Sequence, residues 1–388
     1  MRHFALSSAL AAGLSLISAC HADHAALRGA GAARQEAPDP NRADDAARFL
    51  AGLPGRDASP FKLLEESPAW RQHARDMQAL WGKFQVGRQP AMRRFAQSEL
   101  HAGADRGRAV WYPFSGADAL TMLTFFPGRR TYVMAALEPP GLVPGPERFS
   151  GEALAEELPA IAGTLQSLLQ KSFFVTREMD SQLRGQVTDG VADPLLILLA
   201  RSGYRIEGFE YIQLDDHGRV TPRIPGPKRS AFGLNRGIRF DIRPEQGGDT
   251  SALYYISLNL DDRHMKANHA FPAFLASLGA TDTLLKATSY MLHSPQFGLV
   301  RSLILDRSAS ILQDDSGIPW RFFAGGPWQV QLYGDYVQPY GKSFQFRAQP
   351  DLRAVYEARK QQVRPLKFRI GYGAGRVTSN LQLARRRS

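Results

Sequence analysis

The chain has 388 residues, of which 44% are hydrophobic and 22% are charged, and its formal net charge is +11. These fractions are ordinary for a globular protein, and the length suits one large domain or two to three smaller ones. The cations are spread along the chain, and the only dense cluster is formed by Arg385, Arg386 and Arg387. A nucleic-acid-binding protein usually gathers its cations on one face, so the sequence argues against a nucleic-acid partner.

The first twenty residues, MRHFALSSALAAGLSLISAC, have the organisation of an export signal. Arg2 provides a positive start, and the apolar run 4–17 is too short to span a bilayer comfortably. The run ends in Ile-Ser-Ala-Cys, which resembles the lipobox of bacterial lipoproteins. This resemblance implies cleavage before Cys20 and acylation of Cys20, for example with palmitate. Cys20 is the only cysteine of the chain.

The predicted location follows from this signal. Several acyl chains on Cys20 would anchor the protein stably to the membrane of the cell envelope. The residue after Cys20 is His21 and not an aspartate. In lipoproteins of enteric bacteria this resemblance implies sorting to the outer membrane, with the folded part facing the periplasm. A basic surface would favour an anionic envelope ligand or an envelope protein as partner. The alternative is an arginine-rich composition with no specific partner.

Three segments are predicted along the chain: a signal peptide (1–19), a flexible tether (20–59) rich in Ala, Gly, Pro, Arg and Asp, and a single folded domain (60–388). Hydrophobic periodicity predicts helices and strands that alternate in the folded domain. Helices are expected at 60–100, 119–126, 152–171, 194–202, 271–278, 283–293, 297–307 and 351–362. Strands are expected at 109–114, 131–137, 173–176, 204–214, 237–242, 253–260, 310–313, 328–336 and 366–372.

This alternation predicts an α/β fold, with a mixed, mostly parallel sheet covered by helices on both faces and an N-terminal helical segment. In such sheets ligands bind beyond the carboxyl ends of the strands. The polar residues that follow the predicted strands are therefore the first candidates for a site.

The stretch YPFSGAD follows the first predicted strand. Ser115 and Gly116 could turn backbone amides toward an anion at the start of the helix 119–126. Glu138 ends the next strand, where an acidic residue binds ribose hydroxyls in dinucleotide-binding and methyltransferase folds. The layout resembles theirs, although one glycine stands where those families have two or three. Alternatively, Asp118 caps the helix and Glu138 is a solvated loop residue.

A second candidate site lies in ILQDDSGIPW, residues 311–320. Asp314 and Asp315 follow a short apolar strand, and Ser-Gly provides a turn. Adjacent residues of an extended chain point to opposite faces, so only one of the two carboxylates could reach a given ligand. One aspartate could act as a general base or metal ligand. Alternatively, both carboxylates solvate a strand end.

A third candidate is the stretch TLLKATSYMLH. In the predicted helix 283–293, Lys286, Tyr290 and His293 share one face, which could bind an anionic group or transfer protons. The alternative is a solvated polar face. No zinc site is expected, because His264 and His269 lack a well-spaced third ligand. The absence of a G-x-S-x-G motif argues against a lipase or esterase.

The stretches WYPFSGAD, YVMAALEP, LLKATSYMLH and ILQDDSGIP together resemble a group of uncharacterised exported bacterial proteins. The resemblance covers the chain from about Trp111 onward, implies no activity, and indicates that these stretches belong to one domain. The sequence thus predicts an envelope lipoprotein with a ligand pocket near Ser115, Glu138 and Asp314, and it leaves the cofactor and the reaction open. Two alternatives remain: a non-catalytic envelope interaction protein, and a Rossmann-like enzyme that binds a nucleotide or S-adenosylmethionine.

Overall fold

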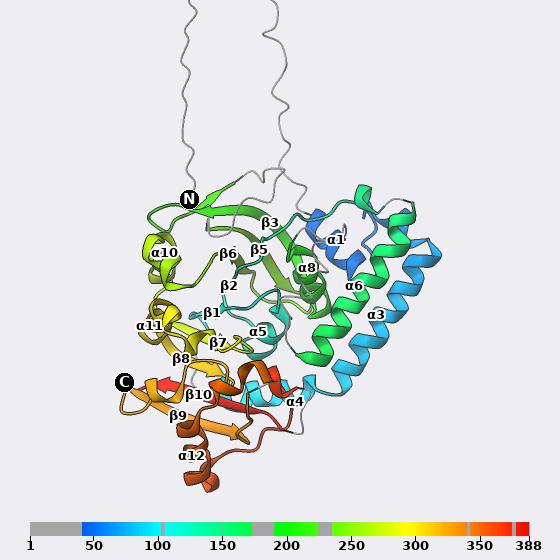
Figure 1. The fold of residues 1–388 in the computed structure, drawn as a ribbon. Helices are drawn as coiled ribbons and strands as arrows, with labels where there is room; N and C mark the ends of the chain where they lie inside the picture. Colours follow the sequence, from blue (N-terminus) through cyan, green and yellow to red (C-terminus); the bar gives the residue numbers. More distant parts are fainter. Residues whose placement is uncertain are drawn as a thin grey trace, which may run out of the picture. The chain divides into compact units, whose positions relative to one another are not determined.

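A ten-stranded mixed sheet forms the centre of the protein, with strand order β4-β3-β5-β6-β2-β1-β7-β8-β10-β9 (Figure 1). The computed structural model describes residues 41–101, 105–149, 151–172, 190–223, 235–339, 342–374 and 378–387, all within one compact unit, 40–388. The strands are β1 (Ala109–Pro113), β2 (Thr131–Ala136), β3 (Tyr204–Leu214), β4 (Val220–Pro222), β5 (Arg236–Pro244), β6 (Ser251–Ser257), β7 (Thr281–Leu285), β8 (Ser308–Gln313), β9 (Trp328–Gly334) and β10 (Asn380–Arg386).

The α/β fold with a mixed sheet is confirmed. The strands β6, β2, β1, β7 and β8 pair in parallel, whereas β5, β3 and β4 on one side and β10 and β9 on the other pair antiparallel. The sheet is therefore parallel at its centre and antiparallel at its flanks. The predicted antiparallel pair within 237–260 is the pair β5 and β6.

The helices are α1 (Arg42–Leu50), α2 (Lys62–Glu65), α3 (Pro68–Val86), α4 (Gln89–Phe95), α5 (Ala119–Phe125), α6 (Glu152–Lys171), α8 (Ala192–Arg201), α9 (Asp262–Ala267), α10 (Ala270–Ser277), α11 (Gly298–Arg307) and α12 (Pro350–Ala358). Two hydrophobic clusters take alternate residues of the strands. Val110 and Tyr112 pack with residues of α1, α3, α5, α6 and α8, whereas Trp111 packs with residues of α10 and α11. This alternation follows from the two-residue period of a strand.

Helix α3 shows how the local sequence sets an element. Ser67 accepts a hydrogen bond from the backbone N–H of Trp70 at 3.1 Å, and Pro68 occupies the first helical position. Both features are typical of a helix start. The residues at helical spacing, Trp70, His73, Met77, Trp81 and Phe84, are buried, as predicted. Helix α6 lies beside α3 (Figure 1).

Three predicted elements need correction. The segment 283–293 is no helix: β7 ends at Leu285, and a turn with the short helix η3 (Met291–His293) follows. All five residues of β7 are buried, so the strand lacks the alternation that would have revealed it. The segment 366–372 is no strand, and the last strand is β10. Helix α1 lies within the expected tether, and its Phe49 and Leu50 are buried, so ordered structure begins before Pro60.

Other predictions fall outside the described residues. The predicted signal peptide, the predicted acylation site Cys20 and the expected strand 173–176 all lie there. Within the described part of the chain, no helix combines the length and the apolar character needed to cross a membrane.

Candidate functional site

The candidate site lies where β1 and β7 run side by side at the centre of the sheet. After β1 the chain crosses through α5 to β2 on one side, whereas β7 continues through α11 to β8 on the other side. The loops that follow β1 and β7 therefore diverge from each other. Such a topological switch point leaves a crevice beyond the strand ends, which is the usual ligand position in open α/β sheets.

The loop after β1 is sharply turned. Phe114 and Gly116 both adopt left-handed backbone angles, with φ values of 57° and 51°. Asp118 caps α5, because its carboxylate accepts hydrogen bonds from the backbone N–H and the hydroxyl of Thr121 at 3.2 and 3.0 Å. The alternative proposed for Asp118, a helix cap, is thus what the structure shows. Ser115 donates its hydroxyl to the carbonyl of Gly116.

Lys286 stands at the end of β7 and reaches across to the loop after β1. Its amino group forms a buried ion pair with Asp118 and donates to the hydroxyl of Thr121 at 3.0 Å. Tyr112 donates to the same carboxylate at 3.0 Å. Burial lowers the pKa of Lys286, and the charge of Asp118 opposes this change. Lys286 therefore links two strand ends.

A small cavity of about 120 Å³ lies beside this pair. Ser115, Gly116, Asp118, Glu138 and Lys286 line it, so the structure brings together all four residues predicted near β1 and β2 and one predicted near β7. Its other walls are Tyr112, Phe114, Ala136, Leu137, Leu258, Asn259, Leu260, Ala287, Thr288, Ser289, Met291 and Phe297. The volume is below the roughly 300–1,000 Å³ of drug-sized ligand sites, so it suits a small ligand or one part of a larger one.

Asp314 lies next to the cavity without lining it. Its carboxylate accepts hydrogen bonds from the backbone N–H of Ala287 at 3.0 Å and from the backbone and hydroxyl of Ser316. Burial raises the pKa of Asp314. Gly371 packs so closely that a Cβ there would stand 2.1 Å from Asp314 Oδ2. Asp314 thus fixes the loop after β7, and that loop lines the cavity.

Asp315 points into a separate buried network. It accepts hydrogen bonds from the Tyr290 hydroxyl at 2.8 Å and from Asn380 Nδ2 at 3.3 Å. Burial and the charge of Asp314 raise the pKa of Asp315 to about 7. The Tyr290 and His293 rings meet edge to face, with centroids 5.2 Å apart. Burial and two nearby arginines lower the pKa of His293 to about 4.

The three predicted groups are therefore only partly joined. Lys286 lines the cavity, whereas Tyr290, His293 and Asp315 do not line it and form a separate buried network. The shared helical face predicted for Lys286, Tyr290 and His293 does not exist, because this segment is a strand end followed by a turn.

Several cavity residues were not predicted from the sequence. Asn259 and Leu260 follow β6, but the strand was predicted to run through them. Asn259, a polar residue two positions after the end of β6, is the signal that could have revealed this position. Phe297 precedes α11 and gave no signal beyond its aromatic ring.

Among the described residues, no group of three or more His, Cys, Asp or Glu side chains is arranged to hold a metal ion. Comparisons with protein-family models, with curated proteins and with solved structures find no match for this chain. The candidate site must therefore be judged by its own geometry.

Proposed function

We propose that this domain binds a small ligand at the carboxyl ends of β1, β2, β6 and β7, and that the group it recognises is a ring with vicinal hydroxyls, of nucleoside type. The observation that carries this proposal is the strained backbone around the cavity. Six non-glycine residues in the described part of the chain have left-handed φ angles, and four of them, Phe114, Ala287, Ser289 and Tyr290, lie in the two loops at the switch point. Such strain gathers at functional sites.

The strand order supports a nucleoside ligand. The parallel strands lie in the order β6-β2-β1-β7-β8, which corresponds to 3-2-1-4-5 of the dinucleotide-binding sheet. The antiparallel β10 stands between β8 and β9, an arrangement that resembles sheets of methyltransferases that bind S-adenosylmethionine. This is a likeness of layout alone, and residues of the cavity have to carry the chemistry.

The cavity offers suitable groups for a hydroxylated ring. Glu138, at the end of β2, supplies a carboxylate that can accept hydrogen bonds from two neighbouring hydroxyls. The Tyr255 hydroxyl donates to the carbonyl of Glu138 at 2.9 Å and so holds this strand end in place. Phe114 and Phe297 pack edge to face, with ring centroids 5.9 Å apart, and give the cavity an aromatic wall.

The loop after β1 favours a nucleoside over a complete dinucleotide. Glycines in that turn normally let the backbone approach a pyrophosphate. Here Phe114 takes the left-handed conformation itself, and Asp118 is engaged by Lys286. Two side chains thus stand beside the turn where a phosphate chain would have to pass.

A thermal-shift screen of the full chain with adenosine, AMP, S-adenosylmethionine and NAD tests this proposal. A ligand at a hundred times its dissociation constant should stabilise the fold by roughly 2.7 kcal/mol. Glu138→Gln should weaken binding about tenfold, since hydrogen bonds to a charged acceptor are stronger than those to a neutral one. Glu147→Gln, an exposed residue, provides a matched control.

Stabilisation by none of these compounds would contradict a nucleoside ligand. A sugar that stabilises the wild type and not Glu138→Gln would keep the site and change the class of ligand. Equal losses in Glu138→Gln and Glu147→Gln would show that the effect is one of net charge and not of the cavity.

The proposal extends to the location and the fold. We propose that Cys20 is acylated and holds the protein to the cell envelope, on the strength of the lipobox alone. Labelling with an alkyne analogue of palmitate should mark the wild type and not Cys20→Ser.

We also propose that helices cover both faces of the sheet, with α1 to α4 as an N-terminal helical segment, and the two hydrophobic clusters support this arrangement.

A further inference from the structure

The loop after β7, residues 286–290, has a backbone that its own sequence does not favour. Ala287, Ser289 and Tyr290 adopt left-handed φ angles of 51°, 52° and 55°, and the loop, KATSY, contains no glycine. In this conformation the Cβ of an L-residue comes too close to the following carbonyl oxygen, which costs free energy. Residues persist there only where the surrounding structure fixes them. The loop therefore depends on contacts from another part of the chain.

These contacts come from residues 314–316, which follow β8 directly. The Asp314 carboxylate accepts a hydrogen bond from the backbone N–H of Ala287 at 3.0 Å. Ser316 Oγ accepts one from the backbone N–H of Thr288 at 2.8 Å, and the Ser316 carbonyl accepts another from the Thr288 hydroxyl. Two consecutive residues of the loop are thus held through their backbone N–H groups.

The residue between Asp314 and Ser316 holds the end of the loop. Asp315 accepts a hydrogen bond from the Tyr290 hydroxyl at 2.8 Å. Each of the residues 314–316, which we call the clasp, thus binds a different residue of the loop. The clasp is almost completely buried and is not among the residues that line the cavity, whereas three loop residues line it: Ala287, Thr288 and Ser289. It therefore supports the wall of the cavity without being part of it.

We propose that the clasp consists of positioning residues, which hold the loop 286–290 in the strained shape that binds the ligand. This inference rests on the function proposed above, because it concerns the same cavity and uses adenosine as the ligand. Without the clasp, the loop would relax toward ordinary negative φ angles, and fewer molecules would have the cavity wall in its binding shape. The apparent dissociation constant rises in inverse proportion to that fraction.

Ser316→Ala tests the clasp, because it removes an acceptor from the loop without adding charge or bulk. Isothermal titration of the full chain with adenosine should show a dissociation constant about tenfold higher than that of the wild type. Ser308→Ala is the matched control. Ser308 is also a buried serine, but it lies at the other end of β8, where its hydroxyl is 2.7 Å from that of Thr283. Its loss should lower the free energy of unfolding to a similar degree and leave the affinity unchanged.

Glycine provides a rescue that a purely structural role would not give. Ala287→Gly removes the strain at one loop position, because glycine adopts left-handed angles at no steric cost. Ser316→Ala with Ala287→Gly should therefore bind adenosine within about threefold of Ala287→Gly alone. Ala324→Gly is the control for added flexibility, because Ala324 is exposed and has no left-handed φ angle. Combined with Ser316→Ala, it should restore nothing.

Hydrogen exchange tests the clasp without a ligand. The backbone N–H of Met291 donates to the carbonyl of Thr288 at 3.1 Å, so this hydrogen bond spans the two left-handed residues between them. Ser316→Ala should speed exchange of this N–H about tenfold, because the loop opens more often. The matched serine control should not speed it, and Ala287→Gly should slow it again in the double variant.

Equal losses of affinity in Ser316→Ala and Ser308→Ala, or no rescue by Ala287→Gly, would overturn the inference. If adenosine does not bind to the wild type, the proposed function fails, and the exchange of the Met291 N–H alone decides the role of the clasp. Equal exchange in the two serine variants would then overturn it. Faster exchange in Ser316→Ala, reversed by the glycine, would support the clasp even then.

Discussion

Two buried ion pairs lie at opposite ends of the strands of the same sheet, and they differ in what surrounds them. We call the pair at the carboxyl ends the carboxyl-edge pair and the pair at the amino ends the amino-edge pair. At the carboxyl ends of the strands, Lys286 pairs with Asp118. At the amino ends, Arg129 pairs with Asp282 at 2.8 Å. All four side chains are almost completely buried. The burial of a charge pair is therefore common to both edges and cannot by itself mark a functional site.

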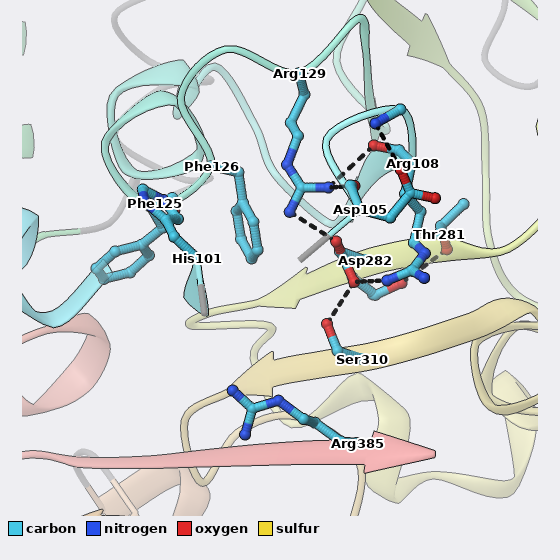
Figure 2. A network of polar contacts seen from close by, with 12 residues as sticks. His101, Asp105, Arg108, Phe125, Phe126, Arg129, Thr281, Asp282, Ser310 and Arg385 are labelled. Atoms are coloured by element: carbon cyan, nitrogen blue, oxygen red, sulfur yellow. Dashed lines mark hydrogen bonds and ion pairs between the residues drawn. The ribbon is translucent and has the colours of Figure 1, made fainter. Parts of the chain in front are cut away.

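The amino-edge pair is bound on all sides by structural partners (Figure 2). Arg129 also donates to the carbonyls of Asp105 and Arg108, and Asp282 also accepts from Ser310 at 2.6 Å and from Arg108 at 3.3 Å. It thus ties the segments that precede β1 and β2 to the strands β7 and β8. The carboxyl-edge pair instead lies beside a cavity and between two strained loops. Position in the sheet, together with strain, distinguishes the candidate site.

The largest effect is expected when a substitution breaks the amino-edge pair. Asp282→Ala should lower the free energy of unfolding by about 3–5 kcal/mol, because it leaves the Arg129 guanidinium buried without its carboxylate. Denaturant unfolding measures the change. Asp241→Ala is the control: its partner Arg239 is partly exposed, so that loss should stay near or below about 1 kcal/mol. A loss for Asp282→Ala no larger than the control would contradict a structural role for this pair.

Neutral double variants sharpen the comparison. Lys286→Met with Asp118→Asn removes both charges, and an asparagine can still cap α5, so most of the wild-type stability should remain. The double variant Arg129→Met with Asp282→Asn should have a free energy of unfolding about 2 kcal/mol or more below that of the wild type, because the carbonyls of Asp105 and Arg108 lose their donor. Unfolding curves of the two double variants provide the test, and equal losses would remove the distinction between the two edges.

A smaller effect depends on pH and concerns Asp315. Its pKa is raised to about 7 in the fold, so folding takes up a proton between about pH 4 and pH 7. The stability that protonation gives is complete below pH 4 and is lost as the pH rises through 7. The free energy of unfolding of Asp315→Asn should therefore rise relative to that of the wild type, by roughly 3 kcal/mol, between pH 4.5 and pH 7.5.

The quantity to measure is the difference in the free energy of unfolding between the wild type and Asp315→Asn. The difference is needed because the titration of His293 changes the stability in the opposite direction. Its pKa is lowered to about 4, so its contribution is lost as the pH falls below its ordinary value of about 6.5. Unfolding of both proteins at each pH cancels that contribution. A difference that does not change with pH would show that Asp315 is charged throughout.

The sequence predicted part of this arrangement correctly. Strand β3 and helix α6 match the predicted ranges, because each has a clear hydrophobic period and a turn residue at its end. Ser115, Gly116 and Glu138 were placed together by the rule that ligands meet the carboxyl ends of strands, and the structure brings them to one cavity.

Other features could not be predicted from local patterns. Strand β7 is buried on both faces, and the polar residues after it fall at helical spacing by chance. Strand β10 lies between β8 and β9, so Leu381, Gln382 and Leu383 are all buried and show no alternation, and the arginines at its end give the appearance of a basic tail. The ion pair of Lys286 with Asp118 joins residues 168 positions apart, which only the tertiary fold determines.

The measurement that most directly tests the central claim is a crystal structure of the protein soaked with adenosine. We predict density in the cavity between Glu138 and Phe297, with ribose hydroxyls within hydrogen-bonding distance of the Glu138 carboxylate. An empty cavity at saturating adenosine, or adenosine bound elsewhere with no contact to the loops after β1 and β7, would contradict the proposal that this switch point is a nucleoside site.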